Sequence, residues 1–182
     1  MIQARSPATI ADLHHVGQKA ELVNGETVLM SPASAGHGRV SGRIFQSLLE
    51  HEERTGHGYA FPDNVGFIVD LPQRLSFSPD AAYFVGPIDE DEFVDGPPTF
   101  AVEVRSPEDF GPAAEQTMAA KRADYFAAGT LVVWDVDMIR DKVIRVYRST
   151  AQNQPTIYTT DDTAEAEPAV PGWTMAVATL LR

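Results

Sequence analysis

The fold is decided by the stretch from Ser78 to Gly129, whose centre reads Phe100-Ala101-Val102-Glu103-Val104-Arg105. This segment predicts a strand, and a strand that is buried on both faces is close to uniformly apolar. The charge of Glu103 needs an explanation, because burying a charge is costly unless the group is paired or bound to a metal. Metal ligation is one explanation. The other is an edge strand that turns Glu103 and Arg105 towards water.

Two charged residues outside this strand complete a possible site. Asp80 directly precedes the apolar run 81–85, and Lys121 lies on the helix that follows the strand. Two carboxylates and a lysine placed in this way are the groups required for metal-assisted cleavage of a phosphodiester. Lys121 shares a helical stripe with Met118 and Tyr125, so we expect it to border the face that packs on the sheet. The alternative is that Lys121 extends from a surface helix into water.

The first half of the chain predicts a hairpin followed by a helix. Asn24-Gly25 stands between two short apolar runs and is typical of a type I′ turn, so an N-terminal β-hairpin opens the fold. Apolar residues at helical spacing predict a helix over 37–54. Before the hairpin, residues 1–19 give one weak helical turn at 9–13, and we treat them as a lead-in.

The second half predicts an α/β fold with a central mixed sheet flanked by helices. The apolar runs 81–85, 100–105 and 131–136 are expected to lie side by side. A helix over 112–128 joins the last two, and a strand, helix and strand of this length form a parallel crossover. Shorter strands are expected at 59–61, 65–69, 74–77, 143–147 and 156–158, and a short helical or capping segment at 171–181.

Length and composition limit the class of protein. A chain of 182 residues fits a single domain, with a core over about 18–148 and a C-terminal strand and capping segment over 149–182. Cysteine is absent, so thiolate sites are excluded and magnesium, manganese or calcium suits the chain better than structural zinc. The net charge of −12 counts against a simple nucleic-acid binder. Met1 to Asp12 lacks a signal-peptide core and no apolar run approaches the roughly 20 residues of a membrane helix. We therefore expect a soluble, cytoplasmic protein.

Several short motifs together resemble a known superfamily. In chain order they are Glu21-Leu22-Val23-Asn24-Gly25-Glu26, Met30-Ser31-Pro32, His37-Gly38, Pro79-Asp80, Val102-Glu103-Val104 with Ser106-Pro107, Lys121, Tyr125, Ala128-Gly129 and Trp134. Their order and spacing resemble the PD-(D/E)XK restriction-endonuclease-like superfamily. More closely, the chain is similar to a widespread bacterial branch of restriction-endonuclease homologues whose function is unknown. The resemblance covers about residues 18–148.

The resemblance implies a restriction-endonuclease-like fold and a set of site residues. Asp80 and Glu103 would be the carboxylates that bind Mg²⁺ or Mn²⁺, and Lys121 would complete the catalytic set. In the superfamily pattern the lysine stands two residues after the glutamate, where this sequence has Arg105. Arginine holds its proton too firmly to act as a base, although it binds phosphate. The branch that this chain resembles supplies the lysine from the following helix, where Lys121 stands.

Five further residues are weaker candidates. Glu21 or Glu26 could add a third carboxylate, although a glutamate in a hairpin is more often solvated. His37 could contact a phosphate or relay a proton, and a histidine near a helix start is as common without a function. Arg39 and Arg43 are spaced i, i+4 on the polar face of their helix and could follow a phosphate backbone, or they could be solvated.

Three functions are consistent with these residues. The first is a metal-dependent endonuclease that hydrolyses phosphodiester bonds, most simply in DNA, and two strands with two cuts would suit a homodimer. The second is an inactive nuclease-like scaffold that binds a partner protein, which the acidic composition and Arg105 favour. The third is a metal-dependent hydrolase of a small phosphorylated substrate. If Asp80 and Glu103 are crowded together, the pKa of at least one should be raised.

Overall fold

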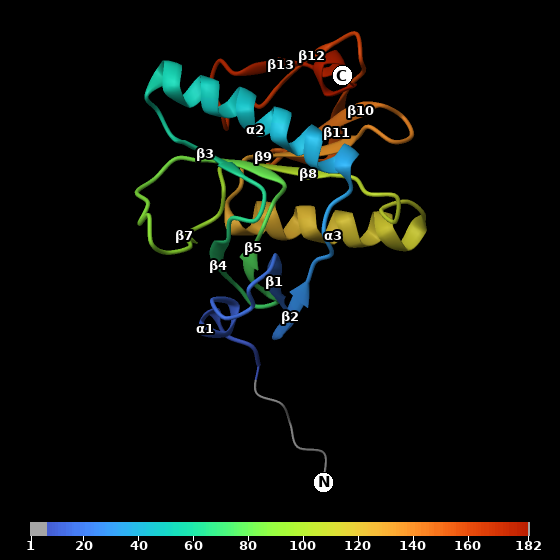
Figure 1. Cartoon of the computed structure of the whole chain (residues 1–182). Helices are drawn as coiled ribbons and strands as arrows, with labels where there is room; N and C mark the ends of the chain where they lie inside the picture. The colour runs from blue at the N-terminus through green and yellow to red at the C-terminus, as the bar shows by residue number, and fades with distance from the viewer. Residues whose placement is uncertain (1–6, 182) are drawn as a thin grey trace.

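A six-stranded mixed sheet lies at the centre of the protein in a computed structural model that describes residues 7–181. Helix α2 (Ala35–Thr55) crosses one face of this sheet and helix α3 (Pro112–Ala128) crosses the other (Figure 1). The strands, in their order across the sheet, are β11 (Ala151–Tyr158), β10 (Val143–Arg148), β9 (Val132–Asp137), β8 (Phe100–Val104), β6 (Ala81–Phe84) and β3 (Tyr59–Pro62). The predicted α/β class, with a central mixed sheet flanked by helices, is confirmed.

A second sheet of five strands lies below the first in Figure 1. Its strands, in spatial order, are β2 (Glu26–Leu29), β1 (Ala20–Val23), β5 (Arg74–Phe77), β4 (Phe67–Leu71) and β7 (Val94–Asp95). The predicted hairpin joins β1 to β2, and Asn24 and Gly25 have φ angles of 52° and 75°. Both residues accept positive φ, which a type I′ turn requires. The sequence did not predict that the short strands divide into two sheets.

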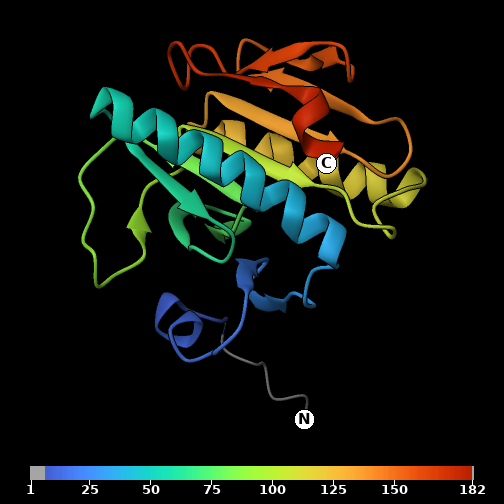
Figure 2. The same cartoon turned by 45° about the horizontal axis from the view of Figure 1, so that its top comes forward.

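The two ends of the chain pack beside these sheets. The predicted turn at 9–13 is the short helix α1 (Ile10–Leu13), which Thr9 caps through a capping box with Asp12. The expectations for residues 1–6 lie outside the described part of the chain. At the other end, β12 (Thr163–Glu165) and β13 (Thr174–Ala176) form a small hairpin-like sheet before a 3₁₀ helix, η1 (Val177–Leu181). Figure 2 shows η1 beside α2.

Strand β8 is internal, and its side chains alternate between the two faces. It pairs in parallel with β9 and antiparallel with β6, so the three strands predicted to lie side by side do so. Phe100 and Val102 join the core beneath α2 with Ile44 and Leu48, whereas Ala101 joins the core beneath α3. The same alternation turns Glu103 towards α3. The edge-strand explanation of Glu103 is therefore wrong.

Within residues 7–181, no helix has both the length and the apolar character needed to cross a membrane.

The long helix α2 is amphipathic, with buried Val40, Ile44 and Leu48 on the side facing the sheet. It ends at Gly56, whose φ of 63° gives the left-handed cap that glycine adopts without strain. The start of this helix, not its end, reaches the site.

Candidate active site

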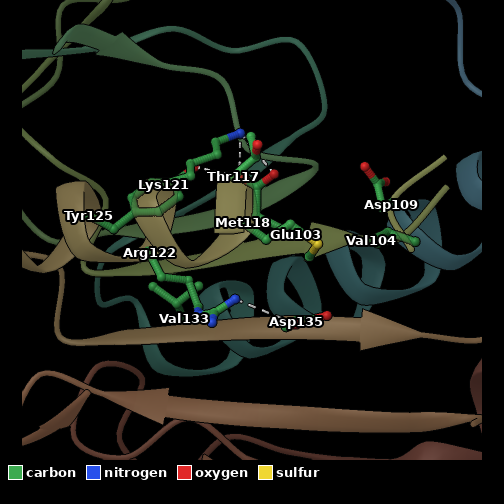
Figure 3. A pocket seen from close by; sticks show the side chains of 10 residues that line it. All are labelled: Glu103, Val104, Asp109, Thr117, Met118, Lys121, Arg122, Tyr125, Val133 and Asp135. Atoms are coloured by element: carbon green, nitrogen blue, oxygen red, sulfur yellow. Dashed lines mark hydrogen bonds and ion pairs between the residues drawn. The ribbon is translucent and has the colours of Figure 1, made fainter. Parts of the chain in front are cut away.

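Glu103 and Lys121 form a close ion pair between β8 and α3 (Figure 3). The Lys121 Nζ lies 2.8 Å from both Glu103 carboxylate oxygens. It also lies 2.9 Å from Oε1 of Glu21. The Tyr125 hydroxyl, one helical turn further along α3, donates to Glu103 Oε1 at 2.6 Å. The surface-helix alternative for Lys121 is wrong, since its side chain is 19% exposed and its ammonium bridges two carboxylates.

Glu21 is buried in this cluster and is not a solvated hairpin residue. Its side chain is 4% exposed. Its Oε1 accepts a hydrogen bond from the Ser78 backbone N–H at 2.9 Å, and its Oε2 accepts one from Arg74 Nη1 at 2.5 Å. Arg74 in turn pairs with Asp124 of α3 at 2.9 Å. Glu21 is thus positioned by backbone and guanidinium donors to hold Lys121 together with Glu103.

Asp80 directly precedes β6, lies beside β8 and lines the same cleft as Glu103. Its backbone N–H donates to the Val102 carbonyl at 2.9 Å, and its Oδ2 accepts the Val104 N–H at 2.8 Å. These bonds fix the carboxylate against β8. Its other oxygen, Oδ1, lies 2.7 Å from Lys19 Nζ and 3.2 Å from His37 Nε2. Asp80, Glu103 and Lys121, the three predicted catalytic residues, therefore lie in one cluster.

The pKa values of Glu103 and Asp80 are shifted in opposite directions. Burial is the main cause that raises the pKa of Glu103, and the nearby charges of Asp80 and Glu21 add to it despite Lys121. Burial also acts to raise the pKa of Asp80, but the hydrogen bond from His37 and the charge of Lys19 outweigh it and hold that pKa well below its usual range. The expected effect of crowding thus falls on Glu103 alone.

Lys121 is a permanent cation at neutral pH. Burial acts to lower its pKa, but the charges of Glu103 and Glu21 outweigh burial and raise the pKa well above its usual range. An ammonium that keeps its proton cannot accept one from an attacking water. It can stabilise negative charge that develops on a bound phosphate.

A cleft of about 720 Å³ opens beside these residues. The charged groups that line it are Lys19, His37, Asp63, Asp80, Glu103, Glu108, Asp109 and Lys121. Glu103 and Lys121 also line a smaller cavity of about 160 Å³ between α3 and the sheet, where Met118 and Arg122 form part of the wall (Figure 3). The acidic groups outnumber the basic ones in the cleft, so a bound cation would be favoured there.

The donor set fits a hard divalent cation held partly by water. Asp80 directly precedes β6, Glu103 lies on the neighbouring strand β8, and both line the same cleft. Among residues 7–181, no group of three or more histidine and acidic side chains is arranged to hold a metal ion. Magnesium typically takes one or two protein carboxylates and keeps several waters. The pair Asp80 and Glu103 meets that requirement, with no thiolate and no closed cage.

Arg105 does not occupy the position of a catalytic lysine. Its side chain is 3% exposed, and its guanidinium donates to both oxygens of Asp135 at 2.6 and 2.7 Å. It also pairs with Glu115 of α3. Asp135 interrupts the apolar run 131–136, so the sequence contained a second buried charge that could have indicated this pair.

The remaining candidates divide between the site and the surface. His37 reaches the site, since it contacts Asp80 and its Nδ1 lies 3.3 Å from Ser106 Oγ. Glu26 is exposed on β2. Arg43 donates to the Thr179 carbonyl at 2.9 Å, and Arg39 is exposed on α2; neither is among the residues lining the cleft.

Sequence reasoning missed Lys19 and Asp63. Lys19 Nζ lies 2.6 Å from Asp63 Oδ1 and 2.7 Å from Asp80 Oδ1. Burial acts to lower the pKa of Lys19, but Asp80 and Asp63 raise it above its usual value. Lys19 follows a weakly patterned segment and Asp63 sits in a turn, so neither had a periodicity to mark it. The only feature of the sequence that could have drawn attention to Lys19 is that the chain has just three lysines.

The fold and this carboxylate–lysine cluster define a nuclease-like protein of the restriction-endonuclease-like class. The family model described as "Uma2: Putative restriction endonuclease" matches residues 8–178, so the chain belongs to the Uma2 family. The structure is similar to the crystal structure of a "putative nuclease belonging to DUF820" from Anabaena variabilis ATCC 29413. That similarity has a TM-score of 0.74 and 14% identity, and it covers 96% of this chain and 97% of the other. No curated protein matches the sequence.

Arg105 should stabilise the fold without taking part in the site. We expect Arg105→Met to lower the free energy of unfolding by about 3 kcal/mol, because the buried Asp135 would keep only Arg122, whose Nη1 lies 3.7 Å from its Oδ2. Arg140→Met, which removes an exposed arginine stacked on Phe110, should cost less than about 1 kcal/mol. Urea unfolding measures both changes. A stability equal to wild type in Arg105→Met would contradict this role.

His37 should make stability depend on pH above neutrality. The hydrogen bond to Asp80 is the main cause that raises its pKa, and burial only partly opposes it. The folded protein then binds the proton more tightly than the unfolded chain, so stability should fall as pH rises from about 6.5 through the raised pKa. Urea unfolding between pH 6 and 9 should show this slope, and His37→Gln should flatten it. Asp80→Asn should also reduce it; an unchanged slope in both variants would refute the assignment.

Proposed function

We propose that the protein is a metal-dependent endonuclease that hydrolyses phosphodiester bonds in DNA. The observation that carries the proposal is the Lys121 ammonium, 2.8 Å from Glu103, in the same cleft as Asp80. Two carboxylates for a metal and a cation for the phosphate are the groups that this hydrolysis needs. Membership of the Uma2 family supports a nuclease.

The roles of the residues follow from their contacts. Asp80 and Glu103 would hold Mg²⁺ or Mn²⁺, which when bound would polarise the phosphate and lower the pKa of a bound water. Lys121 stabilises the negative charge of the phosphate. Tyr125 and Glu21 are positioning residues, because they hold Glu103 and Lys121 respectively. His37 orients Asp80 through its contact with Oδ1.

The acidic cleft favours a second candidate function. Its volume of about 720 Å³ suits a small molecule, and its acidic residues outnumber its basic ones. Without a basic groove, a duplex would gain little from nonspecific phosphate contacts. A metal-dependent hydrolase of a small phosphorylated substrate would need no such groove. The inactive scaffold was favoured by the acidic composition and by Arg105, which stands where the superfamily pattern has a lysine. The second argument no longer applies, because Arg105 pairs with Asp135 and Lys121 provides a positive charge beside Glu103.

Cleavage assays test these roles directly. Plasmid and single-stranded DNA are incubated with Mg²⁺, Mn²⁺ or chelator, and bis(p-nitrophenyl) phosphate is assayed in parallel. We expect Asp80→Asn, Glu103→Gln and Lys121→Met each to slow cleavage by at least about 100-fold, because each removes a group that stabilises the transition state. Lys142→Met removes an exposed lysine and serves as the control. Turnover of the small diester without DNA cleavage would favour the second function.

Metal binding should stabilise the folded protein. At a metal concentration 100 times the Kd, binding to the folded state alone adds about 2.7 kcal/mol, so Mg²⁺ or Mn²⁺ should raise the melting temperature of the wild type. Asp80→Asn and Glu103→Gln should lose most of that shift. Equal shifts in all three proteins would place the ion elsewhere, for example at the acidic loop 89–95.

DNA affinity provides a separate check on the substrate. Because the chain is acidic and few basic groups line the cleft, binding should require the metal and change little with salt. A titration at two salt concentrations measures both effects, and size measurement with and without DNA tests the homodimer that two-strand cleavage would suit. Absence of DNA binding under every condition would leave the hydrolase of a small substrate if the diester is cleaved, and the partner-binding scaffold if it is not.

A further inference from the structure

Lys19 is a second lysine in the site, and its surroundings differ from those of Lys121. Its backbone carbonyl accepts a hydrogen bond from Met30 N–H at 3.0 Å, which fixes the chain just before β1. Its side chain, 17% exposed, reaches between Asp63 and Asp80 and ends in the cleft. A lysine stem has four methylenes and can move its ammonium while its backbone stays fixed.

Lys19 contacts the Asp80 oxygen that is not hydrogen-bonded to the backbone of β8. Asp80 Oδ2 accepts the Val104 N–H, and that bond belongs to the junction of β6 and β8. Oδ1 has no backbone contact of this kind; it lies 2.7 Å from Lys19 Nζ and 3.2 Å from His37 Nε2. A divalent cation on Asp80 and the Lys19 ammonium compete for the same atom, and they repel each other at such short range.

Asp63 provides a place for the lysine when it leaves Asp80. Its Oδ1 is buried and accepts no hydrogen bond from residues 7–181, so the Lys19 charge at 2.6 Å is what balances it. Movement of the ammonium away from Asp80 can keep this second contact. The released cation then stays on the wall of the cleft, where a phosphate would approach.

We propose that the Lys19 ammonium competes with a divalent cation for Asp80 Oδ1, so that metal binding breaks the contact of Lys19 with Asp80 and leaves Lys19 paired with Asp63 alone. The inference rests on the proposed function, since it assumes that Asp80 binds the metal. It makes Lys19 a residue that sets the affinity of the site for the metal.

Calorimetric titration with MnCl₂ tests the competition. Removing the competitor should tighten binding, so Lys19→Met should lower the Kd for Mn²⁺ by about tenfold, which corresponds to the loss of one close ion pair. Lys142→Met removes the same charge from an exposed turn and should leave the Kd unchanged. Lys19→Gln, which keeps a polar side chain, should reproduce the tighter binding if Lys19→Met folds poorly.

Displacement can also be observed at the lysine itself. The chain contains three lysines, so protein labelled with ¹³C-lysine gives three Cε signals, and the Lys19→Met spectrum identifies the one from Lys19. Titration with diamagnetic Mg²⁺ should shift the Lys19 signal along the binding curve and leave the Lys142 signal in place. A Lys19 signal that stays fixed at saturating Mg²⁺ would overturn the proposal.

Two failures are distinguishable in these experiments. If wild type and Asp80→Asn bind Mn²⁺ equally, Asp80 is not a ligand, and both the proposed metal site and the competition by Lys19 are overturned. If the wild type binds through Asp80 but Lys19→Met and Lys19→Gln bind no more tightly, the role of Lys19 alone is overturned. A lower melting temperature with an unchanged Kd would show that Lys19 is structural.

Discussion

The site depends on one buried cation, the ammonium of Lys121, placed between Glu103 and Glu21. A buried charge without its partner costs several kcal/mol, so each of the three side chains constrains where the others can lie. Glu103 comes from the central sheet, Glu21 from the N-terminal hairpin and Lys121 from the crossover helix. Balancing their charges joins the two sheets and α3 into one arrangement, with the cleft at the junction.

The main elements of the fold and the three central residues could be predicted from the sequence. Asn24-Gly25 gave a hairpin because few other residues adopt positive φ at both positions. Glu103 was recognisable because a charge inside an apolar strand conflicts with burial, and the conflict is resolved by Lys121. Such local contradictions are informative, since a sequence retains them only where another part of the structure compensates.

The partners of distant charges could not be predicted in the same way. Arg105 stands where the superfamily pattern has a lysine, and only the pairing of β8 with β9 shows that Asp135 takes it instead. Lys19 and Asp63 lie in segments without periodicity, so nothing in their local sequence indicated Asp80 as a neighbour. The division of the strands into two sheets was missed for a related reason: strand propensity indicates that a segment is extended, not which edge it joins.

The long-range contacts of the hairpin also determine when the site can form during synthesis of the chain. Lys19 contacts a residue 61 positions further along the chain, and Glu21 accepts from one 57 positions away. Contacts of long sequence separation form slowly, because closing the loop costs entropy before the contact stabilises it. Lys19 and Glu21 are synthesised before their partners, which lie just before β6 and on α3. A growing chain therefore carries the acidic residues of the site without their final geometry until synthesis has passed α3.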